Sequence, residues 1–166
     1  MHSEEFKNRF LPLWPSVYKF AQSLLNDKQE AEDCTQEIFL KLWSRRNSLD
    51  SVENIKAFVM QITRNFCIDK LRTRKRVTLD ISQQVIRADI DLQGQLENKD
   101  LVARVELIMR QLPEQQRSLI HLRSIEGFEM KEIAEITGLS IEHARVTLSR
   151  ARTAIRQLYQ KYYGDE

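Results

Sequence analysis

The chain has 166 residues and a formal net charge of +2, from 26 lysines and arginines against 24 aspartates and glutamates. With 42% hydrophobic and 30% charged residues it is typical of a water-soluble globular protein, and four glycines and three prolines are too few for a turn-rich β fold. No run approaches the roughly 20 apolar residues of a membrane span, and the start MHSEEFKNRF lacks a secretory apolar stretch, so we do not expect a membrane protein.

Apolar spacing and turn residues predict three helices in the amino-terminal half, over residues 4–26, 28–46 and 52–74. Pro12 and Pro15 are expected to kink or restart the first helix. Asp27, followed by Glu30, resembles a capping box that opens the second. We assign these helices to one domain, residues 1–76.

A polar segment, residues 77–98, follows this domain and is acidic toward its end. Its weak periodicity favours a flexible linker. The second domain, residues 99–166, is predicted to hold two helices, over about 99–111 and 113–124, and then a helix-turn-helix. The predicted fold class is therefore all-α, with two small helical domains joined by a linker.

The helix-turn-helix is predicted in MKEIAEITGLSIEHARVTLSRARTAIR, which begins at Met130. Gly138 suits the positive φ of the turn, and Leu139 can fill the space between the helices. Ser140 supplies a side-chain oxygen for the N-cap, so the second helix should begin near Ile141.

The faces of this second helix differ in chemistry. One face is apolar and should pack on the preceding helices: Ile141, Ala144, Leu148, Ala151, Ile155 and Leu158. The opposite face is largely polar: Glu142, His143, Val146, Ser149, Arg150 and Thr153. Arg145, Arg152 and Arg156 line one flank, as suits a helix in the DNA major groove between two rows of phosphates. An ordinary amphipathic helix with a solvated basic face is the alternative.

The helix AEDCTQEIFLKLWSRR has one narrow core stripe: Ala31, Cys34, Ile38 and Leu42. Phe39, Leu40 and Trp43 project elsewhere, near acidic and amide groups. Aromatic residues ringed by polar groups are typical of protein interfaces. A bundle that wraps the helix on more than one side would bury Phe39 and Trp43 instead, and the sequence leaves both alternatives open.

The helix ENIKAFVMQITRNFCIDKLRTRKR leaves Lys56, Arg64 and Asn65 outside its apolar stripe, and a basic run follows from Lys70. With Phe58 nearby, these groups could combine phosphate contact with base stacking. A solvated helix end is the simpler explanation of the basic run.

The two cysteines, Cys34 and Cys67, have neither CxxC spacing nor histidines in metal-ligand register. We expect a reduced, cytoplasmic protein in which Cys34 is a small core residue. No metal-protease motif, phosphate-binding loop or nucleophile arrangement occurs in the sequence, so no catalytic residue, metal site or cofactor is predicted.

Four stretches together resemble bacterial sigma factors of the extracytoplasmic-function group: AEDCTQEIFLKLW, NIKAFVMQITRNFCIDKLR, LPEQQRSLIHLRSIEGFEMKEIAEITGLS and ARVTLSRARTAIR. Their order and spacing match over nearly the whole chain. The resemblance implies a dissociable specificity subunit with only the second and fourth sigma domains. It implies binding to core RNA polymerase and direction to promoters, without catalysis of RNA synthesis.

The resemblance also implies three sets of contacts. Core polymerase would contact Asp33, Gln36, Glu37, Phe39, Leu40 and Trp43. The -10 element of the promoter would be melted and read by Arg45, Arg46, Asn54, Lys56, Phe58, Arg64, Asn65, Asp69 and Arg72. The -35 element would be read as duplex by Glu142, His143, Arg145, Val146, Ser149 and Arg150. Promoter choice is expected to reside at Arg145, Val146 and Thr147, where the sequence departs from many relatives.

The implied partners are core RNA polymerase, promoter DNA and an anti-sigma factor, and the protein is expected to be a monomer when free. Two other functions are weighed. A conventional dimeric helix-turn-helix regulator would read a palindrome with half-sites about 34 Å apart. A nucleic-acid enzyme is disfavoured because adjacent carboxylates such as Glu32 and Asp33 point about 100° apart on a helix.

Overall fold

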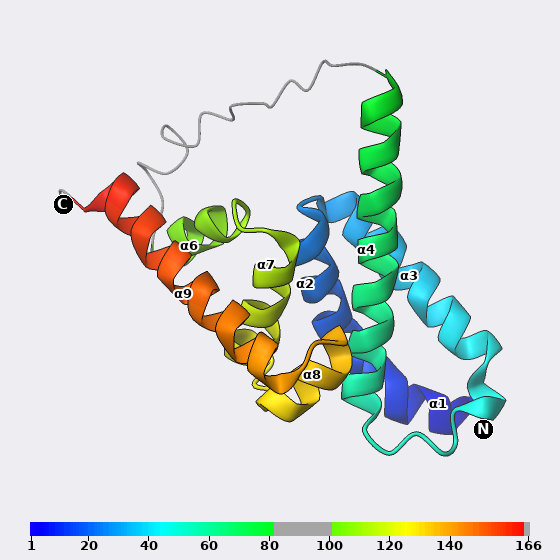
Figure 1. The fold of residues 1–166 in the computed structure, drawn as a ribbon. Helices are drawn as coiled ribbons and strands as arrows, with labels where there is room; N and C mark the ends of the chain where they lie inside the picture. The colour runs from blue at the N-terminus through cyan, green and yellow to red at the C-terminus, as the bar shows by residue number, and fades with distance from the viewer. Residues whose placement is uncertain (82–100, 165–166) are drawn as a thin grey trace.

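The computed structural model describes residues 1–81 and 101–164, and this part of the chain is helical, with no β-strand. Its α-helices are α1 Ser3–Phe10, α2 Trp14–Leu25, α3 Lys28–Ser44, α4 Ile55–Ile81, α6 Leu101–Met109, α7 Glu114–Ile120, α8 Met130–Thr137 and α9 Ile141–Tyr163 (Figure 1). Short 3-10 turns cover Leu11–Leu13 and Arg46–Ser48, and a π-helical turn covers His121–Ile125. The all-α prediction is confirmed.

Local chemistry sets where α2 and α3 begin. The chain passes from α1 to α2 through the turn that contains Pro12, so the predicted restart occurs there. Asp27 caps α3 by accepting a hydrogen bond from the Glu30 amide at 2.9 Å. The Glu30 carboxylate pairs with Arg74 of α4.

The predicted helix-turn-helix is present. Gly138 ends α8 with φ of 75°, and its amide donates to the Ala134 carbonyl at 2.9 Å. Ser140 Oγ accepts from the His143 amide at 3.1 Å, so α9 begins at Ile141 as predicted. At the other end of α8, Glu129 and Glu132 form a capping box.

Helix α4 runs to Ile81 rather than ending at Arg74, because no glycine or proline interrupts residues 75–81. It therefore extends into the segment predicted as a linker. The rest of that predicted linker, from residue 82 to residue 98, lies outside the described residues.

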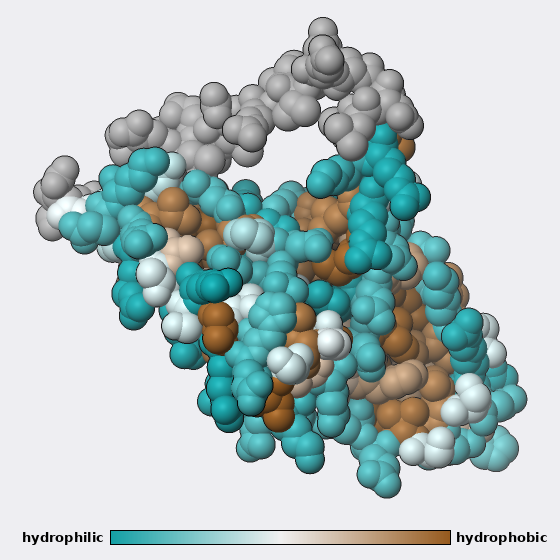
Figure 2. Space-filling model, viewed as in Figure 1, coloured by the Kyte–Doolittle hydropathy of each residue, from teal (hydrophilic) through white to brown (hydrophobic). Residues whose placement is uncertain are grey.

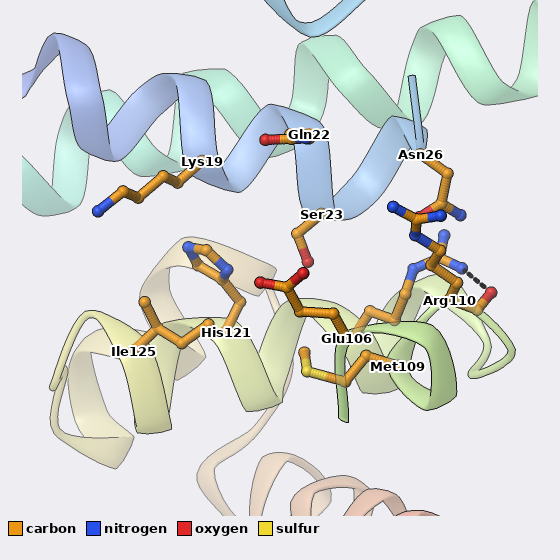
Figure 3. Close-up of a pocket in the computed structure, with 10 residues that line it drawn as sticks. Lys19, Gln22, Ser23, Asn26, Glu106, Met109, Arg110, His121 and Ile125 are labelled. Atoms are coloured by element: carbon orange, nitrogen blue, oxygen red, sulfur yellow. Dashed lines mark hydrogen bonds between the residues drawn. The ribbon is translucent and has the colours of Figure 1, made fainter. Parts of the chain in front are cut away.

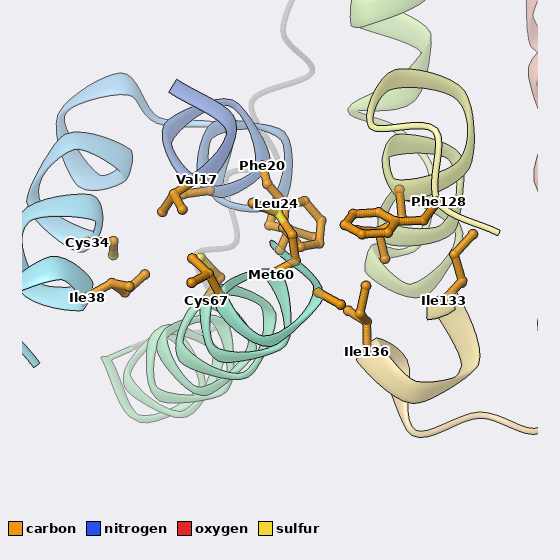
Figure 4. Close-up of a cluster of buried hydrophobic side chains, with 14 of the residues drawn as sticks. Val17, Phe20, Leu24, Cys34, Ile38, Met60, Cys67, Phe128, Ile133 and Ile136 are labelled. Atoms are coloured by element: carbon orange, nitrogen blue, oxygen red, sulfur yellow. The ribbon is translucent and has the colours of Figure 1, made fainter. Parts of the chain in front are cut away.

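The amino-terminal and carboxy-terminal helices pack against each other. Helix α4 lies beside α8, and α2 lies beside α7 (Figure 1). One hydrophobic cluster continues across the junction, from Phe20, Leu24 and Met60 on one side to Phe128, Ile133 and Ile136 on the other (Figure 4). Both cysteines are buried and free in the same cluster, which confirms the prediction that Cys34 is a core residue. The two helical units are thus joined by packing and not by the chain alone.

Arg117 makes hydrogen bonds across the same junction. Its guanidinium donates to the carbonyls of Arg110 at 3.1 Å and Leu112 at 2.9 Å. It also donates to the Leu24 carbonyl at 3.1 Å, in the last turn of α2, where backbone carbonyls lack helical partners. Only 8% of Arg117 is exposed, and this burial lowers its pKa.

Arg117→Met should lower the free energy of unfolding by about 3 kcal/mol, because the three carbonyls lose a charged donor at a buried junction. Urea denaturation followed by circular dichroism would measure the change. Arg110→Met is the control, since the Arg110 side chain is exposed and the variant should differ from wild type by less than about 0.5 kcal/mol. Equal effects of the two variants would contradict this role of Arg117.

Candidate polymerase and nucleic-acid interfaces

Helix α9 presents a continuous solvent-facing surface. All six residues predicted to read duplex DNA are exposed: Glu142, His143, Arg145, Val146, Ser149 and Arg150. On the opposite side, Ala144, Leu148 and Ala151 are buried, and α9 packs there against α7 and α8. The helix therefore has a packed face and a free face, as a groove-reading helix requires.

Two predictions for α9 are wrong. Ile141 was expected in the core but is 38% exposed, because the first turn of α9 lies at the edge of the packing. Thr147 was expected to take part in promoter choice but is only 5% exposed, since it lies on the packed side between Ala144 and Ala151. Arg145 and Val146 remain exposed.

An arginine-lined groove runs along the flank of α9. It has a volume of about 460 Å³ and includes Arg145, Arg152 and Arg156. Arg123, from the π-helical turn, joins them, held by a hydrogen bond from its Nη1 to the Phe128 carbonyl at 2.8 Å. Sequence reasoning missed Arg123 because only the tertiary fold brings it beside α9. Four guanidinium groups in one groove are suited to contact with a phosphate row.

Helix α3 exposes acidic, amide and apolar groups together. Asp33, Gln36 and Glu37 are exposed, and Leu40 is 67% exposed. Figure 2 shows hydrophobic side chains gathered between α3 and α4 at the surface, bordered by hydrophilic ones. An apolar group of this exposure within a polar border is typical of a protein interface.

The two aromatic residues of α3 have different environments. Phe39 is 5% exposed and lies against Trp14, with 4.8 Å between ring centroids, so it belongs to the core and does not present a surface to a partner. Trp43 is half-buried: its ring is nearly perpendicular to that of Phe6, with 5.1 Å between the ring centroids. The Arg46 guanidinium lies 4.1 Å from the centroid of the Trp43 ring. Phe39 is therefore buried in the core, as the second alternative had it, whereas Trp43 lies at the boundary between core and surface.

The residues predicted to contact the -10 element divide into three groups by environment. Four are exposed: Arg45, Asn65, Asp69 and Arg72. Arg46, Phe58 and Arg64 are partly buried, and burial lowers the pKa of Arg64. Asn54 and Lys56, at the start of α4, are engaged by the carboxy-terminal half of the chain.

These engaged residues face two carboxylates. Lys56 Nζ lies 3.0 Å from Glu126 Oε2, and Asn54 Nδ2 donates to Glu132 Oε2 at 2.8 Å. Asn54 Oδ1 also accepts from the Ala57 amide at 3.1 Å, which fixes the amide orientation at the start of α4. The start of α4 is therefore in contact with the segment that leads into the helix-turn-helix.

Glu126 is the centre of this contact, and its side chain is only 6% exposed. It accepts a hydrogen bond from Ser16 Oγ at 3.2 Å, and His121 Nε2 lies 3.5 Å from its other oxygen. The imidazole of His121 and the ammonium of Lys56 hold the Glu126 pKa at about 2, against the opposing effect of burial. Sequence reasoning did not single out Glu126, because its three partners come from α2, α4 and the π-helical turn.

A cavity of about 400 Å³ adjoins the same junction, between α2 and the α6–α7 segment. Figure 3 shows Lys19 and Gln22 of α2 across from His121, with Glu106 of α6 between the two sides. Within residues 1–81 and 101–164, no group of three or more histidines, cysteines or acidic residues is arranged to hold a metal ion. None of the described helices is long and apolar enough to cross a membrane.

Two regions of one protein family match the chain, one in each half. Sigma-70 region 2 matches residues 12–77, and Sigma-70 region 4 matches residues 103–155. The chain is a sigma factor of the extracytoplasmic-function group. It directs RNA polymerase to promoters, as the resemblance in the sequence implied.

Two sigma factors of known name align with this chain over most of their length. The RNA polymerase sigma factor SigZ of Bacillus subtilis (strain 168) is 27% identical over 152 residues, which cover 89% of this chain and 85% of SigZ. The ECF RNA polymerase sigma factor SigM of the same organism is 28% identical, over 90% of this chain and 92% of SigM.

The fold of this sigma factor matches that of solved relatives. The sigma factor RpoE from Bartonella quintana, solved with the anti-sigma factor NepR, has 26% identity and a TM-score of 0.78, over 95% of this chain and 98% of RpoE. CnrH, solved with the cytosolic domain of CnrY, has 21% identity and a TM-score of 0.71, over 96% of this chain and 90% of CnrH, which shows a shared fold.

The Glu126 contact of this sigma factor should be sensitive to acid. Because the folded-state pKa is about 2 and the ordinary value is 4.5, the carboxylate contributes stability above pH 4.5 that is lost as pH falls toward 2. Wild type should exceed Glu126→Gln in free energy of unfolding by about 2 kcal/mol at pH 7. Urea denaturation at several pH values should show the difference closing between pH 4.5 and 2. A difference that stays constant over this range would contradict the assignment.

Proposed function

We propose that this sigma factor contacts core RNA polymerase through α3, reads the -35 element with α9, and melts and reads the -10 element with the α3–α4 loop and α4. The observation that supports this most strongly is on α9. Its six predicted contact residues are all exposed on a helix whose opposite side is packed. A separate exposed surface on α3 provides for a protein partner.

The -35 contact is proposed as major-groove readout. Arg145 and Arg150 can donate two hydrogen bonds each to a guanine edge, and Val146, which is 47% exposed, can contact a thymine methyl group. The groove that contains Arg123 and Arg152 would lie along a phosphate row and hold the helix in register.

The polymerase contact is proposed to centre on Leu40, with Asp33, Gln36 and Glu37 as its polar border and Trp43 at its edge. Phe39 lies beneath this surface and packs against Trp14, which fixes the position of this part of α3. An exposed leucine that becomes buried on association is a favourable interface centre, while the polar border contributes specificity.

The -10 contact is proposed for the exposed residues of the loop and α4, together with Asn54 and Lys56. Amide and guanidinium groups recognise unpaired bases and single-strand phosphates better than they recognise a closed duplex. Phe58 and Arg64 are partly buried and are proposed to contribute at the margin of this surface.

The remaining partners are also proposed. An anti-sigma factor is supported by the solved relative RpoE, whose structure contains NepR. We propose that the protein acts in the cytoplasm as a monomer, without cofactor and without catalysing a reaction itself. No observation favours the alternative of a conventional dimeric regulator.

Arg150→Ala should weaken binding to promoter duplex by about 1–3 kcal/mol, because one base-edge or phosphate contact is removed. Fluorescence anisotropy with the reconstituted polymerase holoenzyme and labelled promoter DNA would measure it. Lys161→Ala is the control, since Lys161 lies farther along α9 and outside the proposed reading face. Unchanged affinity in Arg150→Ala would remove this residue from the contact set.

Leu40→Ala should weaken binding to purified bacterial core RNA polymerase by about tenfold, with the free energy of unfolding unchanged, because this side chain is exposed in the free protein. Phe39→Ala should instead lower the free energy of unfolding by about 3–5 kcal/mol through loss of core packing. Leu101→Ala, also at an exposed position, should leave polymerase binding intact. Polymerase titrations and urea denaturation would separate the effects, and full polymerase affinity in Leu40→Ala would place the contact elsewhere.

A further inference from the structure

The start of α4 has two roles that compete for the same atoms. Asn54 and Lys56 belong to the surface proposed for the -10 element, yet their donors are directed at Glu132 and Glu126. A hydrogen bond from Lys56 Nζ to the Glu126 carbonyl, at 3.5 Å, adds a weaker contact to the same segment. The N–H groups that Asn54 and Lys56 direct at the carboxylates become available to a nucleic acid only when the carboxylates release them.

The carboxylates also make contacts that hold them in place. Glu126 is fixed by Ser16 of α2 as well as by Lys56, so one buried side chain bridges α2 and α4 to the carboxy-terminal half. Glu132 is part of the capping box of α8 and reaches Asn54 with its other oxygen. Glu132 belongs to α8 and Glu126 to the segment just before it, so both contacts come from the unit that carries the helix-turn-helix.

The surrounding surface supports a competition between carboxylate and phosphate. Lys56 also lies 5.3 Å from the centroid of the Phe128 ring, so its ammonium is held between an aromatic face and a carboxylate. Its side chain is still 39% exposed, which leaves a path for a phosphate to approach. A DNA phosphate carries the same charge as the Glu126 carboxylate that it would displace.

We propose that Glu126 and Glu132 form an internal latch, which closes the two helical units on each other and withholds Asn54 and Lys56 from the -10 strand until the units separate. The withholding part of this inference rests on the proposed function of α4. The latch makes closure and -10 binding mutually exclusive, so the apparent DNA affinity of the free protein equals the affinity of the open form multiplied by the open fraction. Binding to DNA in turn favours the open form.

A charge swap tests closure without reference to DNA. Lys56→Glu and Glu126→Lys each place like charges together at the junction, so each single variant should have a larger radius of gyration than wild type. The double variant restores an opposite-charge pair and should return to the wild-type value. Small-angle X-ray scattering of the full chain would measure it, with Glu135→Lys, at an exposed position of α8, as the charge-matched control. Single variants as compact as wild type, or a double variant as expanded as the singles, would overturn the latch.

The withholding of Lys56 is tested with fluorescein-labelled single-stranded DNA of randomised sequence. Glu126→Gln should bind this probe about threefold or more tightly than wild type, because the open fraction rises. Glu135→Gln should bind as wild type does. Ser16→Ala removes one hydrogen bond to Glu126 and lies outside the proposed DNA surface. It should also tighten binding to the probe, but by less than Glu126→Gln does. It replaces Glu126→Gln in this test if that variant folds poorly.

The variant Lys56→Ala distinguishes a failure of the latch from a failure of the proposed -10 role of Lys56. If it weakens binding to the probe while Glu126→Gln and Ser16→Ala leave binding unchanged, the -10 surface stands and the latch is overturned. If Lys56→Ala has no effect on binding, the proposed -10 role of this residue fails, and the withholding fails with it. Weaker binding in Lys56→Ala together with tighter binding in Glu126→Gln supports both.

Discussion

The apolar contact between α4 and α8 is the constraint on which the rest of this structure depends. Each helical unit is small, and a small unit leaves much of its apolar surface without internal cover. Packing α2 and α4 against α7 and α8 buries Phe20 and Met60 together with Phe128 and Ile136 in one cluster. The orientation of the helix-turn-helix relative to α4 follows from this burial.

Once the apolar contact is made, the polar groups around it need partners. Arg117 donates to backbone carbonyls on both sides of the junction, and Glu126 accepts from Ser16 and faces Lys56. Buried charges are tolerated only when they are paired in this way. The same requirement connects the fold to function, because Lys56 belongs to the surface proposed for promoter DNA. In the proposed promoter-bound form, Lys56 and Glu126 take other partners.

Much of the fold could be predicted because its signals are local. Asp27, Gly138 and Ser140 specify helix ends through their own backbone neighbours, and all three behave as expected. Predictions were wrong where the outcome depended on neighbours distant in the chain. Thr147 is buried and Ile141 is exposed because the packing of α7 and α8, rather than helical periodicity, decides which part of α9 is covered. Phe39 is core because Trp14, from another helix, lies against it.

The sequence by itself determined the family, the helical class, the turn of the helix-turn-helix and the exposed polar face of α9, because these depend on residue type and short-range spacing. Only the tertiary structure decided which aromatic residues of α3 are available and which arginines share a groove. It also decided that Glu126 and Glu132 engage the start of α4. These features bring together groups far apart in the chain, such as Lys56 and Glu126, and their pairing depends on how two apolar surfaces pack.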